Sequence, residues 1–164
     1  MKTLSCFCIT TFAFAVFSCA NAQQPQRFPF VIQGDDSVDS ITSQAGLLDA
    51  PAGKNGFVRV EGEHFYVGEN RIRFWGMNVC FPANFPSHES SDVIAPHMAK
   101  LGINAVRFHH ADGQSAPSGI WSNEIENGVR KFDPEMVDRL DYFLAKLHEN
   151  GIYADLNLHV SRTL

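Results

Sequence analysis

Several polar side chains in the sequence follow short apolar runs, a pattern typical of strands that deliver residues to a site at their C-terminal ends. The clearest run is residues 102–112, where an apolar stretch leads to an arginine, two histidines and Asp112. Guanidinium, imidazole and amide groups bind oxygen atoms, and imidazole and carboxyl groups can also transfer protons. These residue types fit a binding site or a hydrolytic site, and alone they name no reaction. The candidate site residues on strands are Asn78, Arg107, His109, His110, Asn157 and His159.

Three predicted strands position these residues, at 72–79, 105–109 and 153–159. Side chains alternate between the two faces of a strand. Each predicted strand therefore sorts into one apolar face, which would meet helices, and one polar face. In the second strand, for example, Val106 and Phe108 oppose Arg107 and His109. The polar face carries Asn78, Arg107, His109, Asp155, Asn157 and His159.

Helices predicted at residues 90–101 and from 133 onward separate the strands. Pro96 is expected early in the first. Asp133 is the expected N-cap of the second, with Pro134 at its first position and Asn150-Gly151 at its C-terminal end. Strands that alternate with helices predict an α/β fold with a parallel sheet. A sheet covered by helices on both faces is apolar on both. The polar face instead predicts the first three βα units of a (β/α)8 TIM barrel, over residues 71–164, whose interior opens at the C-terminal ends of its strands.

A short antiparallel β meander is predicted before the barrel, at residues 57–70. Alternating runs there are separated by the turn residues Glu61-Gly62-Glu63 and Gly68-Glu69-Asn70. We expect this meander to cap one end of the barrel. Residues 23–56 have no comparable pattern and are predicted to be an irregular N-terminal segment. A long loop is predicted at residues 113–131.

Residues 1–22 are predicted to be a secretory signal peptide. Lys2 supplies positive charge, residues 9–17 are apolar apart from two threonines, and Ala20-Asn21-Ala22 has the form of a cleavage site. The apolar run is shorter than the roughly 20 residues that span a bilayer. We therefore expect a secreted or periplasmic protein with no stable membrane association after cleavage near Ala22. Lipidation of Cys19 is the alternative.

Composition bears on partners and cofactors. The formal net charge is −5 and there is no Lys/Arg run, which argues against a nucleic-acid partner. Cys80 is the single cysteine left after cleavage and is expected to be a buried structural thiol. Adjacent strand residues such as His109 and His110 point to opposite faces, so we expect no metal site built from them with His159, and no cofactor.

Two other interpretations of the polar residues remain open. Arg107 and Asp155 could pair simply to hold the sheet together. Asp112 and Asp155 could act as an acid and a base, although no spacing in the sequence enforces their proximity.

From about residue 57 onward the sequence resembles clan A glycoside hydrolases, in particular the cellulase-type family 5. The matching segments are residues 65–79, 101–110 and 151–159. The resemblance implies that these hold the first three barrel strands. It implies that Arg107 supports the catalytic nucleophile and that His159 lines a sugar subsite. His109 and His110 resemble additional subsite residues, and Trp121 in the long loop is either a sugar-stacking platform or plain loop packing.

The family's two catalytic glutamates, at the ends of its fourth and seventh strands, have no counterpart in the sequence. Such enzymes retain configuration with two carboxylates about 5 Å apart. We therefore expect an N-terminal fragment of a secreted glycoside hydrolase acting on a β-linked poly- or oligosaccharide, with both glutamates after Leu164 and no activity on its own. The carbohydrate substrate is the expected partner. A non-catalytic carbohydrate-binding protein and a metal-dependent TIM-barrel hydrolase are the alternatives.

Overall fold

The structure is a computed structural model that describes Arg27 and residues 40–158. The chain divides into two units, residues 1–31 and 32–164, and every element described below belongs to the second. In chain order these elements are η1 (Ala45–Leu47), β1 (Arg59–Glu61), β2 (His64–Val67), β3 (Asn70–Ile72), β4 (Gly76–Cys80), η2 (Phe81–Asn84), α1 (His88–Lys100), β5 (Ala105–His109), β6 (Trp121–Glu126), β7 (Val129–Phe132), α2 (Pro134–Glu149) and β8 (Tyr153–Leu156).

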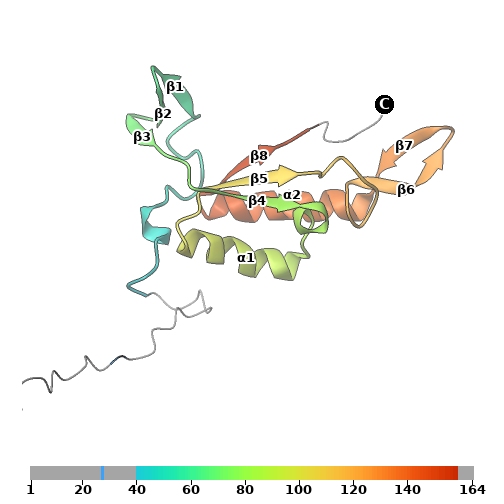
Figure 1. Ribbon diagram of the computed structural model, residues 1–164, viewed down its shortest axis with the longest axis horizontal. Helices are drawn as coiled ribbons and strands as arrows, with labels where there is room; N and C mark the ends of the chain where they lie inside the picture. Colours follow the sequence, from blue (N-terminus) through green and yellow to red (C-terminus); the bar gives the residue numbers. More distant parts are fainter. Residues whose placement is uncertain (1–26, 28–39, 159–164) are drawn as a thin grey trace, which may run out of the picture. The chain divides into compact units, whose positions relative to one another are not determined.

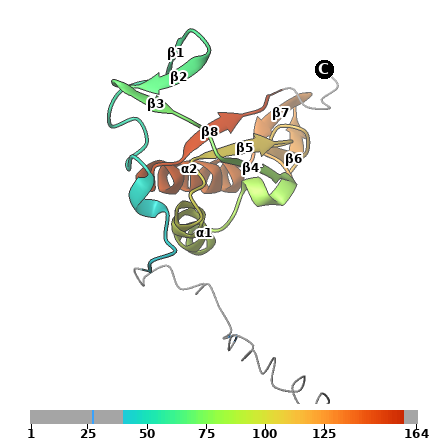
Figure 2. The same ribbon diagram turned by 60° about the vertical axis from the view of Figure 1, so that its left-hand side comes forward.

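A three-stranded parallel sheet in the order β4-β5-β8 forms the centre of this unit. Helices α1 and α2 lie together against one of its faces (Figures 1 and 2). The central strand β5 follows the predicted alternation, because Val106 and Phe108 are fully buried under the helices while Arg107 is exposed. No helix among the described residues covers the opposite face.

The apolar core lies between the sheet and the two helices. Phe108 of β5 meets Phe143 of α2 edge-on, with ring centroids 5.7 Å apart. The buried residues of α2 are Met136, Leu140, Phe143 and Leu147. The sequence predicts an apolar stripe of Val137, Leu140, Leu144 and Leu147 on this helix. Leu140 and Leu147 are buried as expected, and Met136 and Phe143 are buried with them.

The helix ends follow from local chemistry. The Asp133 side chain accepts hydrogen bonds from Glu135 N at 3.0 Å and Met136 N at 3.1 Å, which confirms it as the N-cap of α2. Gly151 follows the helix at φ 79°, the left-handed conformation of a C-terminal cap. Helix α1 begins two residues before its predicted start, because Ser87 caps it by accepting from Ser90 N. Pro96 lies in the interior of α1 and not near its start as expected.

The antiparallel meander is present as the sheet β1-β2-β3, which confirms that prediction. The single strand expected at residues 72–79 is instead divided between β3 and β4. The Asn104 side chain explains the break. It accepts from Trp75 N at 2.7 Å and donates to Arg73 O at 2.8 Å, so these backbone groups bond to a side chain and not to a neighbouring strand.

The long loop expected at residues 113–131 contains the hairpin β6-β7, so the prediction of a loop was wrong for most of this segment. Asn127 and Gly128 join the two strands with φ of 53° and 77°. A two-residue turn of this kind needs positive φ at both positions, and Asn-Gly is its preferred sequence.

The outer strands β4 and β8 are less covered than predicted. Leu156 and Leu158, expected to meet helices, are 48% and 64% exposed, and Met77 of β4 is 39% exposed. The two helices cover the middle of the sheet and Val79 of β4, whereas Met77 of β4 and the apolar side chains of β8 stay exposed. The described chain is thus a mixed α/β fold of small sheets and two helices, and closure into a barrel stays a prediction. Within residues 40–158, no helix is long and apolar enough to cross a membrane.

Candidate functional site

Three polar residues lie side by side across the uncovered face of the parallel sheet. The strand register aligns Asn78 of β4 with Arg107 of β5, and Arg107 with Asp155 of β8. Arg107 Nη1 lies 3.4 Å from Asn78 Oδ1, and Arg107 Nε lies 3.9 Å from Asp155 Oδ2. The Arg107 and Asp155 side chains are 46% and 70% exposed, so this ion pair adds little to stability. Arg107 is therefore held in place between two partners without being buried by them.

Cys80, at the end of β4, is only half-buried, contrary to the expectation of a buried thiol. Its sulfur accepts a hydrogen bond from Asn78 Nδ2 at 3.0 Å. The contact helps to orient the Asn78 amide, whose oxygen faces Arg107.

His109 and Asn157 form a second polar pair, where β5 ends and just beyond β8. Asn157 Nδ2 lies 2.8 Å from His109 Nδ1. An amide nitrogen can only donate, so Nδ1 is the acceptor and the ring proton of the neutral imidazole lies on Nε2. Burial lowers the pKa of His109 below its ordinary value of about 6.5, and the neighbouring His110 and Arg107 lower this pKa further. His109 is consequently neutral near pH 7.

Strand alternation predicted that His109 and His110 would point to opposite faces of the sheet. The structure instead places the two rings in contact. Strand β5 ends at His109, and His110 has φ of 59°, which turns its ring back against His109 with centroids 4.0 Å apart. Phe81, also in the left-handed region at φ 53°, stacks on His110 with centroids 4.8 Å apart and planes within 10°. Such backbone conformations are uncommon for residues with side chains, and histidine adopts them more often than phenylalanine does.

The backbone beneath these rings is fixed by Asn84, which sequence reasoning missed. Asn84 is fully buried and its Nδ2 donates to the carbonyl oxygen of His109 at 2.8 Å. Its Oδ1 is buried without a hydrogen-bond partner in the described part of the chain. Phe81 was missed as well. Only the position of residues 81–84, directly after a predicted strand, could have drawn attention to them.

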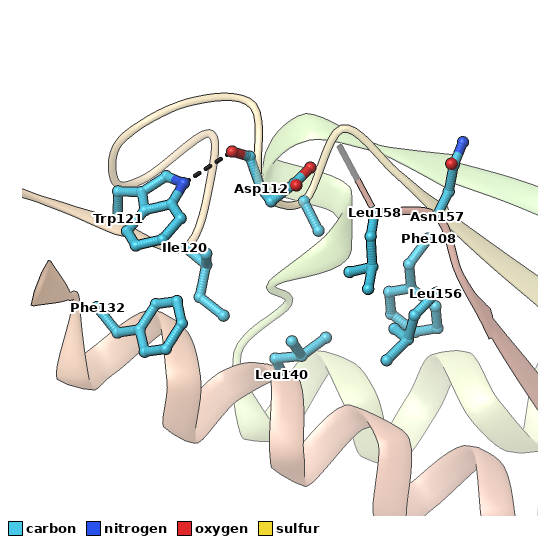
Figure 3. Close-up of a pocket in the computed structure, with 10 residues that line it drawn as sticks. Phe108, Asp112, Ile120, Trp121, Phe132, Leu140, Leu156, Asn157 and Leu158 are labelled. Carbon is cyan, nitrogen blue, oxygen red and sulfur yellow. Dashed lines mark hydrogen bonds between the residues drawn. The ribbon is translucent and has the colours of Figure 1, made fainter. Parts of the chain in front are cut away.

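Trp121 lies in a different environment. It lines an apolar pocket of about 280 Å³ with residues of the helix side of the sheet, including Leu140 and Leu156 (Figure 3). Its ring stacks on Phe132 at 4.8 Å between centroids, and its Nε1 donates to the carbonyl of Asp112 at 2.7 Å. The Asn157 amide points away from this pocket (Figure 3). Asn157 is thus the one described residue of the polar face that shares this pocket with Trp121, and Asn78, Arg107, His109 and His110 do not line it.

The remaining candidates are placed as follows. Asp112 lines the apolar pocket, whereas Asp155 pairs with Arg107, so the two carboxyl groups have different neighbours. His159 lies outside the described residues. Within the described ranges, no group of three His, Cys, Asp or Glu residues is arranged to hold a metal ion.

Comparisons of the chain with protein-family models, with curated proteins and with solved structures found no match.

Proposed function

We propose that residues 71–164 form the first three βα units of a (β/α)8 barrel in a secreted glycoside hydrolase. One observation carries the proposal. The two helices cover one face of the parallel sheet, while the other face presents Arg107 between Asn78 and Asp155 and, towards its C-terminal edge, the neutral His109. A polar face of this kind is expected where a barrel interior opens into an active site. The resemblance of residues 65–79, 101–110 and 151–159 to the first strands of family 5 enzymes supports the same arrangement.

In this proposal the enzyme hydrolyses O-glycosidic bonds of a β-linked poly- or oligosaccharide with retention of configuration. Arg107 holds the carboxylate nucleophile in its ionised form, and Asn78, His109, His110 and His159 meet sugar hydroxyl groups. The retaining mechanism needs two carboxylates about 5 Å apart. None of the described glutamates belongs to β4, β5 or β8, so the proposal requires two glutamates from chain that follows Leu164. It requires no cofactor.

The test is release of reducing ends from β-1,4-glucan and β-mannan by the full-length protein. Arg107→Lys keeps the positive charge and loses the planar guanidinium, so kcat/KM should fall roughly 10- to 100-fold, the range of one hydrogen bond to a charged group. Arg130→Lys, on the exposed strand β7, is the matched control and should leave the rate unchanged. No hydrolysis of any β-linked glycan by the wild-type protein would contradict the proposal.

A carbohydrate-binding protein without catalysis is the second candidate function. Its support is the same polar face, where Arg107, Asn78 and Asp155 can meet sugar hydroxyl groups without any catalytic carboxylate. Calorimetric binding of a β-glucan that is recovered intact after long incubation would support it over the hydrolase.

We further propose that the protein is exported to the periplasm or beyond the cell and cleaved after Ala22. The support is the composition of residues 1–22, which lie outside the described part of the chain. Mass spectrometry of the exported protein should find Gln23 as its first residue. A mature protein that keeps residues 1–22 would contradict this proposal.

A further inference from the structure

The hydrogen bond between Asn157 and His109 has a direction that the sequence could not reveal. Asn157 gives its amide hydrogen to His109 Nδ1 across 2.8 Å, so the ring keeps its own hydrogen on Nε2. Among the described residues, Nε2 of His109 has no hydrogen-bond partner, and it is not one of the polar atoms buried without one. In this arrangement the pair leaves Nε2–H of His109 as a donor for a ligand.

The surroundings keep this donor neutral and fixed. The titratable and charged groups around His109 are Arg107 on β5, His110 just after β5, Cys80 opposite His109 on β4, and Asp155 beside Arg107 on β8. Burial, His110 and Arg107 all oppose a second proton on the ring. His110 is itself held by its stack on Phe81, and the His109 carbonyl is held by Asn84. An aligned, uncharged donor of this kind suits an uncharged acceptor such as a sugar hydroxyl oxygen.

We propose that His109 binds the carbohydrate as a neutral donor through Nε2–H, and that Asn157 is the positioning residue that fixes this tautomer. The inference rests on the proposed function and deepens it. It also changes the role expected for Asn157, which acts on the substrate through His109 and not by direct contact.

The first measurement needs no sugar. Long-range ¹H–¹⁵N spectra of the full chain with ¹⁵N-labelled histidine report which ring nitrogen carries the proton. Wild-type His109 should be the Nε2–H tautomer and should titrate below pH 6.5. Asn157→Asp replaces the donor with an acceptor, so the proton should move to Nδ1 and the titration should shift to higher pH. Asn55→Asp adds the same charge at an exposed site and should change neither property. An Nδ1–H tautomer in the wild-type protein overturns the proposal.

The second measurement adds cellohexaose and mannohexaose as probes, with affinity measured by calorimetry. His109→Leu should weaken binding roughly 5-fold, the effect of one uncharged hydrogen bond. His109→Gln can place an amide N–H near the position of Nε2 and should recover most of that loss. Asn157→Asp should weaken binding to a similar extent as His109→Leu, and Asn157→Ala should do so less. Circular dichroism of each variant checks that it is folded.

The outcomes separate this inference from the function on which it rests. If wild-type protein binds neither sugar, both fail, whatever the tautomer. If the wild type binds a sugar and the His109 and Asn157 variants bind it equally well, the inference alone fails. Weaker binding by His109→Leu and Asn157→Asp, with recovery in His109→Gln, supports it.

Discussion

The buried side chain of Asn84 permits a substitution whose cost should depend on pH. In Asn84→Asp an oxygen replaces the nitrogen that donates to the His109 carbonyl at 2.8 Å. A carboxylate oxygen at this position would face the carbonyl oxygen of His109, and two acceptors cannot form a hydrogen bond in a site that is closed to water. The carboxyl group can keep the contact only when it is protonated and donates through its O–H. The folded state should therefore raise the pKa of this carboxyl above the value of about 3.9 of an unfolded Asp.

The sign and size of the effect follow from this shift. Below about pH 3.9 the carboxyl is protonated in both states, so the variant should be nearly as stable as the wild type. Above that pH the unfolded state releases its proton first, and the free energy of unfolding falls by up to about 1.4 kcal/mol per pH unit until the folded pKa is reached. A fully buried carboxyl can shift by roughly 3 to 5 units, which places its folded pKa at about 7 to 9, so the loss at pH 7 is about 4 kcal/mol. Domains of this kind have about 5 to 15 kcal/mol of stability, so the variant should lose a large part of its stability by pH 7.

Urea denaturation followed by circular dichroism, at several pH values between 4 and 7, gives the test. The difference between variant and wild type at each pH removes the protein's own pH dependence. Asn84→Leu is the matched control. It leaves the His109 carbonyl unpaired at a constant cost of about 1 to 3 kcal/mol with no added pH dependence. An Asn84→Asp penalty that is equal at pH 4 and pH 7 would refute the burial of Asn84 against this carbonyl.

Three further substitutions test the fold. Asp133→Ala removes both capping bonds of α2 and should lower the free energy of unfolding by about 1 kcal/mol in urea titrations, with a cost near zero indicating that the cap is not formed. In Gly128→Ala the new Cβ meets no atom within 4 Å, but it stands on a residue with φ 77°, so the free energy of unfolding should fall by about 1 kcal/mol in the same titrations. Gly46→Ala is equally open, has no positive φ and should leave the stability unchanged. Equal costs for the two substitutions would contradict the left-handed turn. Phe143→Ala removes a fully buried ring and should cost about 3 to 5 kcal/mol by thermal or urea denaturation, and a cost below 1 kcal/mol would show that the ring does not pack on Phe108.

Local signals predicted the parts of the fold that depend on nearby residues. Strand β5 lies between two paired neighbours and under two helices, so its alternation of Val106, Arg107 and Phe108 reported its two faces correctly. The Asp133-Pro134 start of α2 was equally readable, because a cap depends only on the next three residues. The hairpin β6-β7 also had a local signal in Asn127-Gly128, but its strand residues Ser122, Asn123 and Glu124 are poor strand formers and hid the pattern.

Other features depend on residues far apart in the sequence. The left-handed turn at His110 accompanies its stack on Phe81, and the break between β3 and β4 depends on Asn104. No periodicity within residues 102–112 indicates either contact. The same holds for Asn157, whose bond to His109 joins residues 48 positions apart. The sequence predicted the polar residues of the sheet, and only the structure shows which atoms of these residues face one another.

The exposed outer strand β8 has a consequence for the behaviour of the protein in concentrated solution. Within the described residues β8 pairs only with β5, so its other side presents unpaired backbone N–H and C=O groups. Exposed Leu156 and Leu158 lie along the same stretch. Such an edge is a template for a strand from another molecule. Light scattering of the 164-residue chain should therefore show particle size rising with protein concentration, and a charged substitution such as Leu158→Lys should slow that self-association. In a longer protein whose fourth barrel strand pairs with β8, this concentration dependence should be absent.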